Sequence, residues 1–142
     1  MDETMYGYAI KLLAARDYSV DRMRVRLEKR FSRHPGEVID RLLSQRFLDD
    51  RRYAESFVRV RKSRGRLWLR SELIRSGIEQ TITDDVLERE DWPSLVDVLE
   101  ARLKGLKLVP PVPVRQVARL SRFLLRLGYD DDEIRNELEK LI

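Results

Sequence analysis

The segment FLDDRRYAESFVRVRKSRG, residues 47–65, combines the signals that decide the fold of this chain. Two aspartates, Asp49 and Asp50, come before a set of apolar residues spaced three and four apart, namely Tyr53, Ala54, Phe57 and Val58. This spacing predicts one buried face of an α-helix, and Asp is a preferred N-cap residue. Gly65 is predicted to end the helical segment, because glycine readily adopts the left-handed conformation that follows many helices.

Helical spacing continues on both sides of this segment, and no stretch shows sustained alternation of apolar and polar residues. Toward the N-terminus, Thr4 and Ser19 are candidate N-caps, and Pro35 is suited to the first turn of a third helix. Toward the C-terminus, Thr81 or Thr83 is the candidate cap of a short helix. The sequence therefore predicts helices in sets of three.

The C-terminal third repeats this organisation after a break. The proline-rich stretch 110–113 cannot lie inside a helix. Asp130 and Glu133 have the spacing of a capping box, and Tyr129 is expected to pack on Ile134 across that helix start. The acidic residues at 49–50 and 130–133 are therefore interpreted as helix starts with an Asp N-cap rather than as metal or acid–base sites.

The second helix of each set aligns with the others without gaps. The alignment pairs Leu27 with Ile74 and Leu125, and Phe31 with Ile78 and Tyr129. It predicts a stripe of Leu67, Ile74 and Ile78 on the middle helix. One three-helix unit buries too little apolar surface to be stable alone, so neighbours should stack. The predicted fold is all-α, with three tandem three-helix, helix-turn-helix-like repeats at 1–48, 49–90 and 91–142 in an elongated array.

Composition narrows the possible functions. Of the 142 residues, 42% are hydrophobic, 38% are charged and none is cysteine, which excludes disulfides and thiolate catalysis. No apolar run reaches the length of a membrane span, and the N-terminus has no signal-peptide pattern, so a soluble, cytoplasmic monomer is expected. His34 is the only histidine, and no phosphate loop or zinc motif occurs. We therefore expect no enzyme activity, no metal and no cofactor.

Positive charge is concentrated in the middle of the chain. Between Arg51 and Arg75, nine Lys/Arg residues face only two acids, which is a net +7 in a chain whose total is +4. Such a run predicts a surface for a polyanion or an acidic protein. The candidate partner-binding or phosphate-binding residues are Arg51, Arg52, Arg59, Arg61, Lys62, Arg64, Arg66, Trp68, Arg70 and Arg75.

The aromatic residues near this basic run admit two interpretations. Tyr53 and Phe57 are expected in the core, although their spacing also suits base stacking. Trp68 lies one position away from the predicted apolar stripe. It is either an interface anchor among arginines or a buried residue, and the sequence favours neither.

The segment LDDRRYAESFVR (48–59), followed by Gly65 and RSELIRSGI (70–78), resembles the middle repeat of the RecX family of bacterial regulators of the RecA recombinase. Residues 9–31 and 120–129 resemble its flanking repeats. The resemblance implies tandem three-helix repeats that bind the RecA–DNA filament and lower its ATPase and strand-exchange activity. The proline-rich break at 110–113 departs from the family pattern.

Two further functions compete with filament inhibition. A basic protein with pI ≈ 9.6 is suited to binding single- or double-stranded DNA non-specifically through its middle repeat, without a recombinase. Sequence-specific reading is disfavoured, because the third helices begin near acids that repel phosphate. A helical adaptor for another protein is compatible with the residue pattern alone.

Overall fold

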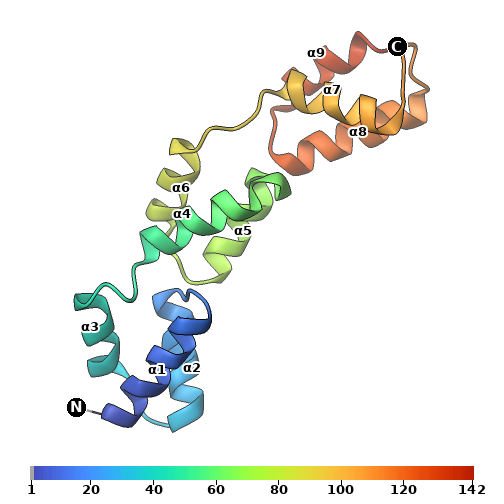
Figure 1. Cartoon of the computed structure of the whole chain (residues 1–142). Coiled ribbons are helices and arrows are strands. Elements are labelled where there is room, and N and C mark those ends of the chain that lie inside the picture. The colour runs from blue at the N-terminus through green and yellow to red at the C-terminus, as the bar shows by residue number, and fades with distance from the viewer. Residues whose placement is uncertain (1) are drawn as a thin grey trace. The chain divides into compact units, whose positions relative to one another are not determined.

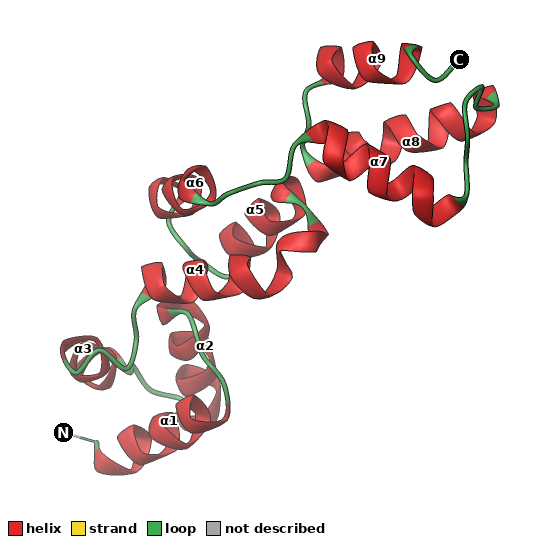
Figure 2. Ribbon diagram, turned by 45° about the horizontal axis from the view of Figure 1, so that its top comes forward, coloured by secondary structure: helices red, strands yellow, loops and turns green. Residues whose placement is uncertain are grey.

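A computed structural model of the chain describes residues 2–142, and in that range all regular secondary structure is helical. Figure 1 labels the helices along the chain, and Figure 2 shows the loops that connect them. The helices are α1 (Glu3–Ala15), α2 (Val20–Phe31), α3 (Gly36–Ser44), α4 (Asp50–Arg61), α5 (Arg66–Arg75), α6 (Gln80–Arg89), α7 (Leu95–Leu106), α8 (Val114–Leu127) and α9 (Asp131–Glu139), with a 3₁₀ turn at Lys62–Arg64. The all-α prediction is confirmed.

Packing divides the chain into two compact units. Unit 1 contains residues 2–61 and Arg70–Arg89, and unit 2 contains Lys62–Leu69 and Glu90–Ile142. These units are defined by packing, whereas the repeat boundaries after residues 48 and 90 concern recurrence in the sequence and stay a prediction. No helix in residues 2–142 has both the length and the apolar character needed to cross a membrane.

In unit 1, α1, α2 and α3 enclose one apolar core (Figure 1). Its fully buried side chains include Met5, Met23, Leu27 and Leu42. The cap of α1 is Asp2, whose carboxylate accepts a hydrogen bond from the Met5 N–H at 3.0 Å. The predicted Thr4 cap was therefore wrong, because the helix begins two residues earlier than that cap implies.

The buried face of α5 also differs from the prediction. Leu69 and Leu73 are completely buried, whereas Leu67 and Ile74 are 52% and 40% exposed. Ile78 is buried as predicted. The buried pairs that correspond across the three second helices are Met23/Leu27, Leu69/Leu73 and Leu120/Leu124.

The error arose at the helix ends. Phe31 is the last residue of α2, and Ser32 after it has a positive φ. Ile78 and Tyr129 instead follow a positive-φ glycine, Gly77 or Gly128. The gap-free alignment therefore paired a residue inside one helix with residues beyond the ends of two others, and this displaced the predicted stripe.

Position 77 requires glycine because of both its backbone conformation and its surroundings. Its φ of +85° is rare for other residues, and a Cβ there would collide with the Asp21 side chain of α2. Its N–H donates to the Ile74 carbonyl at 2.9 Å, and the Ile78 N–H donates to the Leu73 carbonyl at 3.1 Å. These two bonds satisfy carbonyls at the end of α5.

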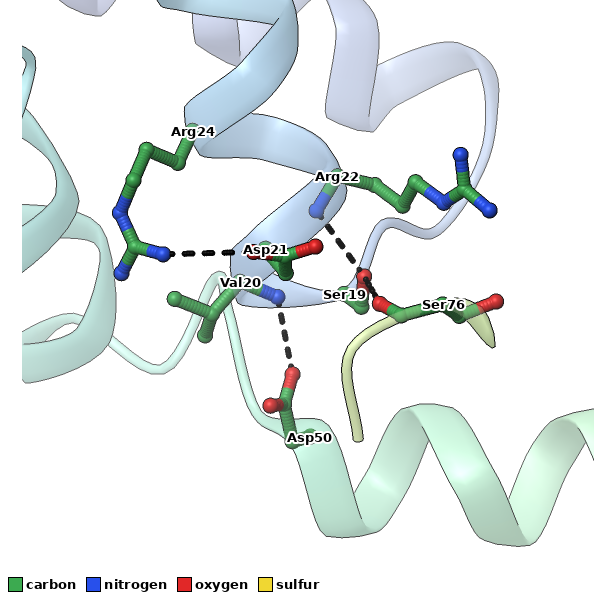
Figure 3. Close-up of polar contacts among 7 residues, drawn as sticks. All are labelled: Ser19, Val20, Asp21, Arg22, Arg24, Asp50 and Ser76. Atoms are coloured by element: carbon green, nitrogen blue, oxygen red, sulfur yellow. Dashed lines mark hydrogen bonds and ion pairs between the residues drawn. The ribbon is translucent and has the colours of Figure 1, made fainter. Parts of the chain in front are cut away.

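The N-terminus of α2 is the point at which three segments of unit 1 meet (Figure 3). The Ser19 hydroxyl accepts from the Arg22 N–H at 3.1 Å and donates to the Ser76 carbonyl at 2.7 Å. The Asp50 carboxylate accepts from the Val20 N–H at 2.8 Å. Ser19 is thus the predicted cap, but it also binds the segment after α5.

The two aspartates at the start of α4 have different roles. Asp49 caps its own helix by accepting from the Arg52 N–H at 3.1 Å, as predicted. Asp50, which the sequence offered as the alternative cap, serves the start of α2 instead. Burial raises the pKa of the Asp50 carboxyl, and the hydrogen bond from Val20 opposes this effect only in part.

Asp50→Asn is expected to reduce the pH dependence of stability. A folded pKa above the ordinary 3.8 means that ionisation of Asp50 opposes folding. The protonated Asp50 carboxyl contributes fully to the stability of the fold below pH 3.8, and this contribution is lost as the pH rises through the folded pKa. The asparagine oxygen still accepts from Val20 but does not ionise. The stability of Asp50→Asn relative to the parent protein should therefore increase with pH in denaturant titrations.

The matched control is Asp50→Ala, which removes the acceptor. It also removes the ionisable group, so it should be less stable than Asp50→Asn by about 1–3 kcal/mol at every pH tested, because the Val20 N–H is left without its partner. A stability difference between Asp50→Asn and the parent protein that does not change with pH would contradict the assignment.

In unit 2, α7, α8 and α9 surround a second core that includes Leu95, Leu99, Leu120 and Leu124. The predicted break at residues 110–113 separates α7 from α8, and the Val112 N–H donates to the Leu141 carbonyl at 2.8 Å. Ser94 caps α7. The sequence had offered no cap for this helix.

Of the predicted N-caps of α9 and α6, one was right and one was wrong. Asp130 caps α9 as predicted, by accepting from the Glu133 N–H at 3.1 Å. Ile134 and Leu138 on the same helix are buried. The threonine cap of α6 was wrong: α6 begins at Gln80, so Thr81 and Thr83 lie inside the helix, and Thr83 is completely buried.

Candidate partner-binding surfaces

The ten predicted site residues are distributed over both compact units. Unit 1 holds Arg51, Arg52, Arg59, Arg61, Arg70 and Arg75, and unit 2 holds Lys62, Arg64, Arg66 and Trp68. The basic run is therefore divided between the two units.

Four of the predicted cations form ion pairs within their own unit. The pairs are Arg51–Asp85 at 2.8 Å, Arg70–Asp84 at 2.8 Å, Arg75–Glu72 at 2.9 Å and Lys62–Glu90 at 3.4 Å. Hydrogen bonds from Arg89 and Arg51 lower the pKa of the Asp85 carboxyl. Acids that follow Thr83 in the sequence, Asp84, Asp85 and Glu90, therefore neutralise part of the basic run.

Arg52 has a structural role as well. Its guanidinium donates to the carbonyls of Arg46 and Phe47, at 2.8 and 3.3 Å, just beyond the end of α3. Arg46 has a positive φ of 61°, so this turn leaves carbonyls that need donors. Arg52 thus stabilises the connection between α3 and α4.

Arg59, Arg61, Arg64 and Arg66 form no ion pair with any residue in the part of the chain that the structure describes. All four side chains are exposed. They remain the strongest cationic candidates of the predicted set, because their charges are available to a partner.

In unit 1, Arg61 belongs to a cation–aromatic surface on α4. Its guanidinium carbon lies 4.4 Å from the centre of the Phe57 ring. The rings of Phe57 and Tyr53 are stacked, with centroids 6.0 Å apart and planes inclined by 20°. Together with Arg16 and Val60 they line a groove of about 400 Å³.

Tyr53 and Phe57 were predicted as core residues, and this was wrong. Both are only half-buried, whereas Ala54 and Val58 on the same helix are completely buried. The apolar face of α4 is wide, so the residues at its centre are buried and those at its edge stay partly accessible. The edge residues are therefore added to the candidate surface of unit 1.

In unit 2, the remaining arginines lie close to tryptophan rings. The Arg64 guanidinium carbon is 4.0 Å from the centre of the half-buried Trp68 ring. Lys62 and Arg66 lie 5.6 and 6.0 Å from the ring of Trp92. Contacts of this kind hold both the cation and the ring in a defined orientation.

Trp92 also lines a pocket of about 380 Å³ in unit 2, which sequence reasoning did not identify. Lys62, Phe123, Leu127 and Tyr129 form other parts of its wall. The Tyr129 hydroxyl donates to the Pro93 carbonyl at 2.5 Å and holds the chain beside Trp92. The sequence signal was the WP dipeptide at 92–93, which places a large aromatic residue in a connection between helices.

Comparisons with known proteins give a consistent result. The family model described as the second three-helix domain of RecX matches residues 49–87. Regulatory protein RecX of Chlorobium phaeobacteroides is 32% identical over 145 residues, covering 99% of this chain and 95% of that protein. Regulatory protein RecX of Chromohalobacter salexigens is 34% identical over 138 residues, covering 92% and 88%.

Among solved structures, the crystal structure of RecX from Lactobacillus salivarius superimposes with a TM-score of 0.75. It covers 97% of this chain and 94% of that one at 20% sequence identity. This likeness concerns the fold and agrees with the all-helical architecture.

Proposed function

Because the chain belongs to the RecX family of regulatory proteins, which are not enzymes, we propose that it binds the RecA–DNA nucleoprotein filament and inhibits its ATP hydrolysis and strand exchange. Through this inhibition it modulates recombinational DNA repair. The regulatory role comes with the family, and the filament as partner is the proposal.

The observation that supports the proposal is that some arginines of the basic run form ion pairs and others do not. Arg51, Arg70 and Arg75 are neutralised within unit 1. Arg59 and Arg61 in the same unit are exposed and form no ion pair in residues 2–142. Uncompensated charges, one of them beside the Phe57 ring, favour an acidic partner surface or phosphate, and a recombinase–DNA filament offers both.

The presence of a candidate surface in each unit suggests how inhibition works. Two modest contacts on one chain bind more tightly than either alone, because the second forms at a high effective concentration. If the two contacts engage neighbouring recombinase subunits, binding favours one arrangement of those subunits and slows the cycle that hydrolysis requires.

Direct DNA binding without a recombinase is the competing function. The acids at the start of α9 disfavour a recognition helix there, because Asp131 and Asp132 are exposed where phosphate would lie. Non-specific binding by the arginines is compatible with the same geometry. The two functions differ in whether the recombinase is needed for tight binding.

The decisive experiment compares binding to RecA filaments preassembled on single-stranded DNA with binding to the same DNA alone, while ATP hydrolysis is followed. We expect tight binding and suppressed hydrolysis with filaments, and weak, salt-sensitive binding to naked DNA. Equal affinity for both, with unchanged hydrolysis, would reject the filament-inhibitor function in favour of direct DNA binding.

A further inference from the structure

Helix α8 carries a row of arginines that lies outside the basic run of residues 51–75. Its 14 residues include no acid. Four arginines recur at intervals of four, three and four residues: Arg115, Arg119, Arg122 and Arg126. At 3.6 residues per turn they fall within about 60° of the helix circumference, so their charges project from one side.

These four charges are not compensated within the described chain. All four side chains are exposed, and none forms an ion pair in residues 2–142. Acids are nevertheless abundant in unit 2, on the neighbouring α9. There Asp131 pairs with Arg135 at 2.7 Å within α9, and Glu137 pairs at 3.0 Å with Lys140, the residue that follows α9. Like charges at i and i+4 destabilise a helix, so an external anion would relieve this repulsion.

A groove of about 320 Å³ runs beside the arginine row, between α7 and α8. The two helices lie side by side within unit 2 (Figures 1 and 2). Arg119, Arg122 and Arg126 line it from α8, and Arg102 and Leu106 line it from α7. The groove is therefore cationic on both sides.

The groove also contains a flat stacking element. The Arg102 guanidinium carbon lies 4.3 Å from the centre of the Phe123 ring, and both residues line the groove. Neither residue belongs to the predicted site. A guanidinium plane supported by an aromatic ring is a surface on which an unpaired nucleobase stacks.

We propose that this surface, the α8 arginine groove (Arg102, Arg115, Arg119, Arg122, Phe123 and Arg126), binds single-stranded nucleic acid. Phosphates lie along the arginine row, where guanidinium groups donate paired hydrogen bonds to them. A base enters the groove against the plane of Arg102 and Phe123. The bases of a duplex are stacked inside it and cannot reach the Arg102–Phe123 pair, and an acidic peptide has no base to stack there. A single strand is therefore the ligand that contacts both the arginine row and this pair.

The site does not depend on the recombinase, so its test is separate from that of the proposed function. Fluorescence anisotropy of a labelled oligothymidylate would be measured against the full chain over a range of salt concentrations. The variant is Arg119→Ala/Arg122→Ala. The control is Lys11→Ala/Lys29→Ala, which removes the same charge from exposed lysines of unit 1.

We expect the arginine variant to bind at least tenfold more weakly, because two charge-assisted phosphate contacts are lost. The slope of log K against log salt should become shallower by about 1.4, which corresponds to two phosphates on a single strand. The lysine control should retain the parent affinity and slope. Circular dichroism should show unchanged helicity in both variants.

A third variant separates geometry from charge. Arg119→Lys/Arg122→Lys keeps both charges but loses the planar donor fork, so we expect the parent salt slope with reduced affinity. Unchanged oligothymidylate binding by Arg119→Ala/Arg122→Ala would overturn the site. Equally tight binding of a duplex, or competition by polyglutamate as effective as that by DNA, would overturn the choice of a single strand.

Discussion

Leu73→Ala is expected to lower the free energy of unfolding by about 2–5 kcal/mol, whereas Ile74→Ala, one position away, should cost much less. Leu73 is completely buried on α5 and Ile74 is 40% exposed. Truncating Leu73 removes apolar contacts and leaves a cavity, while Ile74 has water on one side. Denaturant unfolding followed by circular dichroism measures both.

The pair tests the register of α5 directly. Both are aliphatic truncations on the same helix, and both leave the backbone bonds to Gly77 and Ile78 in place. If Ile74→Ala were the more costly change, the gap-free alignment that equated Ile74 with Leu27 would be right and the buried face of α5 would be misassigned.

The second large effect concerns filament inhibition and rests on the proposed function. Arg59→Glu/Arg61→Glu should raise the concentration needed for half-maximal inhibition of filament ATPase by at least tenfold, because reversing charge turns attraction into repulsion. Stability should fall by only about 0.5–1 kcal/mol, from the lost contact between Arg61 and Phe57.

The choice of two residues follows from the ion pairs. Lys62 is left unchanged, because it pairs with Glu90 at 3.4 Å and its reversal would disturb unit 2. Lys11→Glu/Lys29→Glu is the matched control in unit 1, with the same change in net charge at exposed sites. Full inhibition by the arginine variant, or equal loss in the control, would remove this surface as the contact.

Some features of the candidate and proposed surfaces were visible in the sequence and were missed. The arginine row of α8 has helical spacing that is visible at positions 115, 119, 122 and 126. It was overlooked because its charge is spread over a whole helix instead of concentrated in a short run. Trp92 was likewise visible beside Pro93, but its proximity to Lys62 was not.

The sequence by itself determined the helices and several of their ends. Ser19, Asp49 and Asp130 cap helices as predicted, because each accepts from an N–H only three residues away and the interaction is local. Gly65 and Gly128 adopt positive φ where a helical segment had to end, for the same reason. Family membership was also inferred from the sequence, and a relative that is 32% identical over 99% of this chain shows it.

Only the tertiary structure decided what depends on residues distant in the chain. Asp50 accepts a hydrogen bond from Val20, thirty positions away, and Asp85 forms an ion pair with Arg51. The same packing buries Leu73 and exposes Ile74. Spacing along one helix specifies which residues share a face, but which face is covered, and which charge meets its opposite, depends on the other helices that pack there.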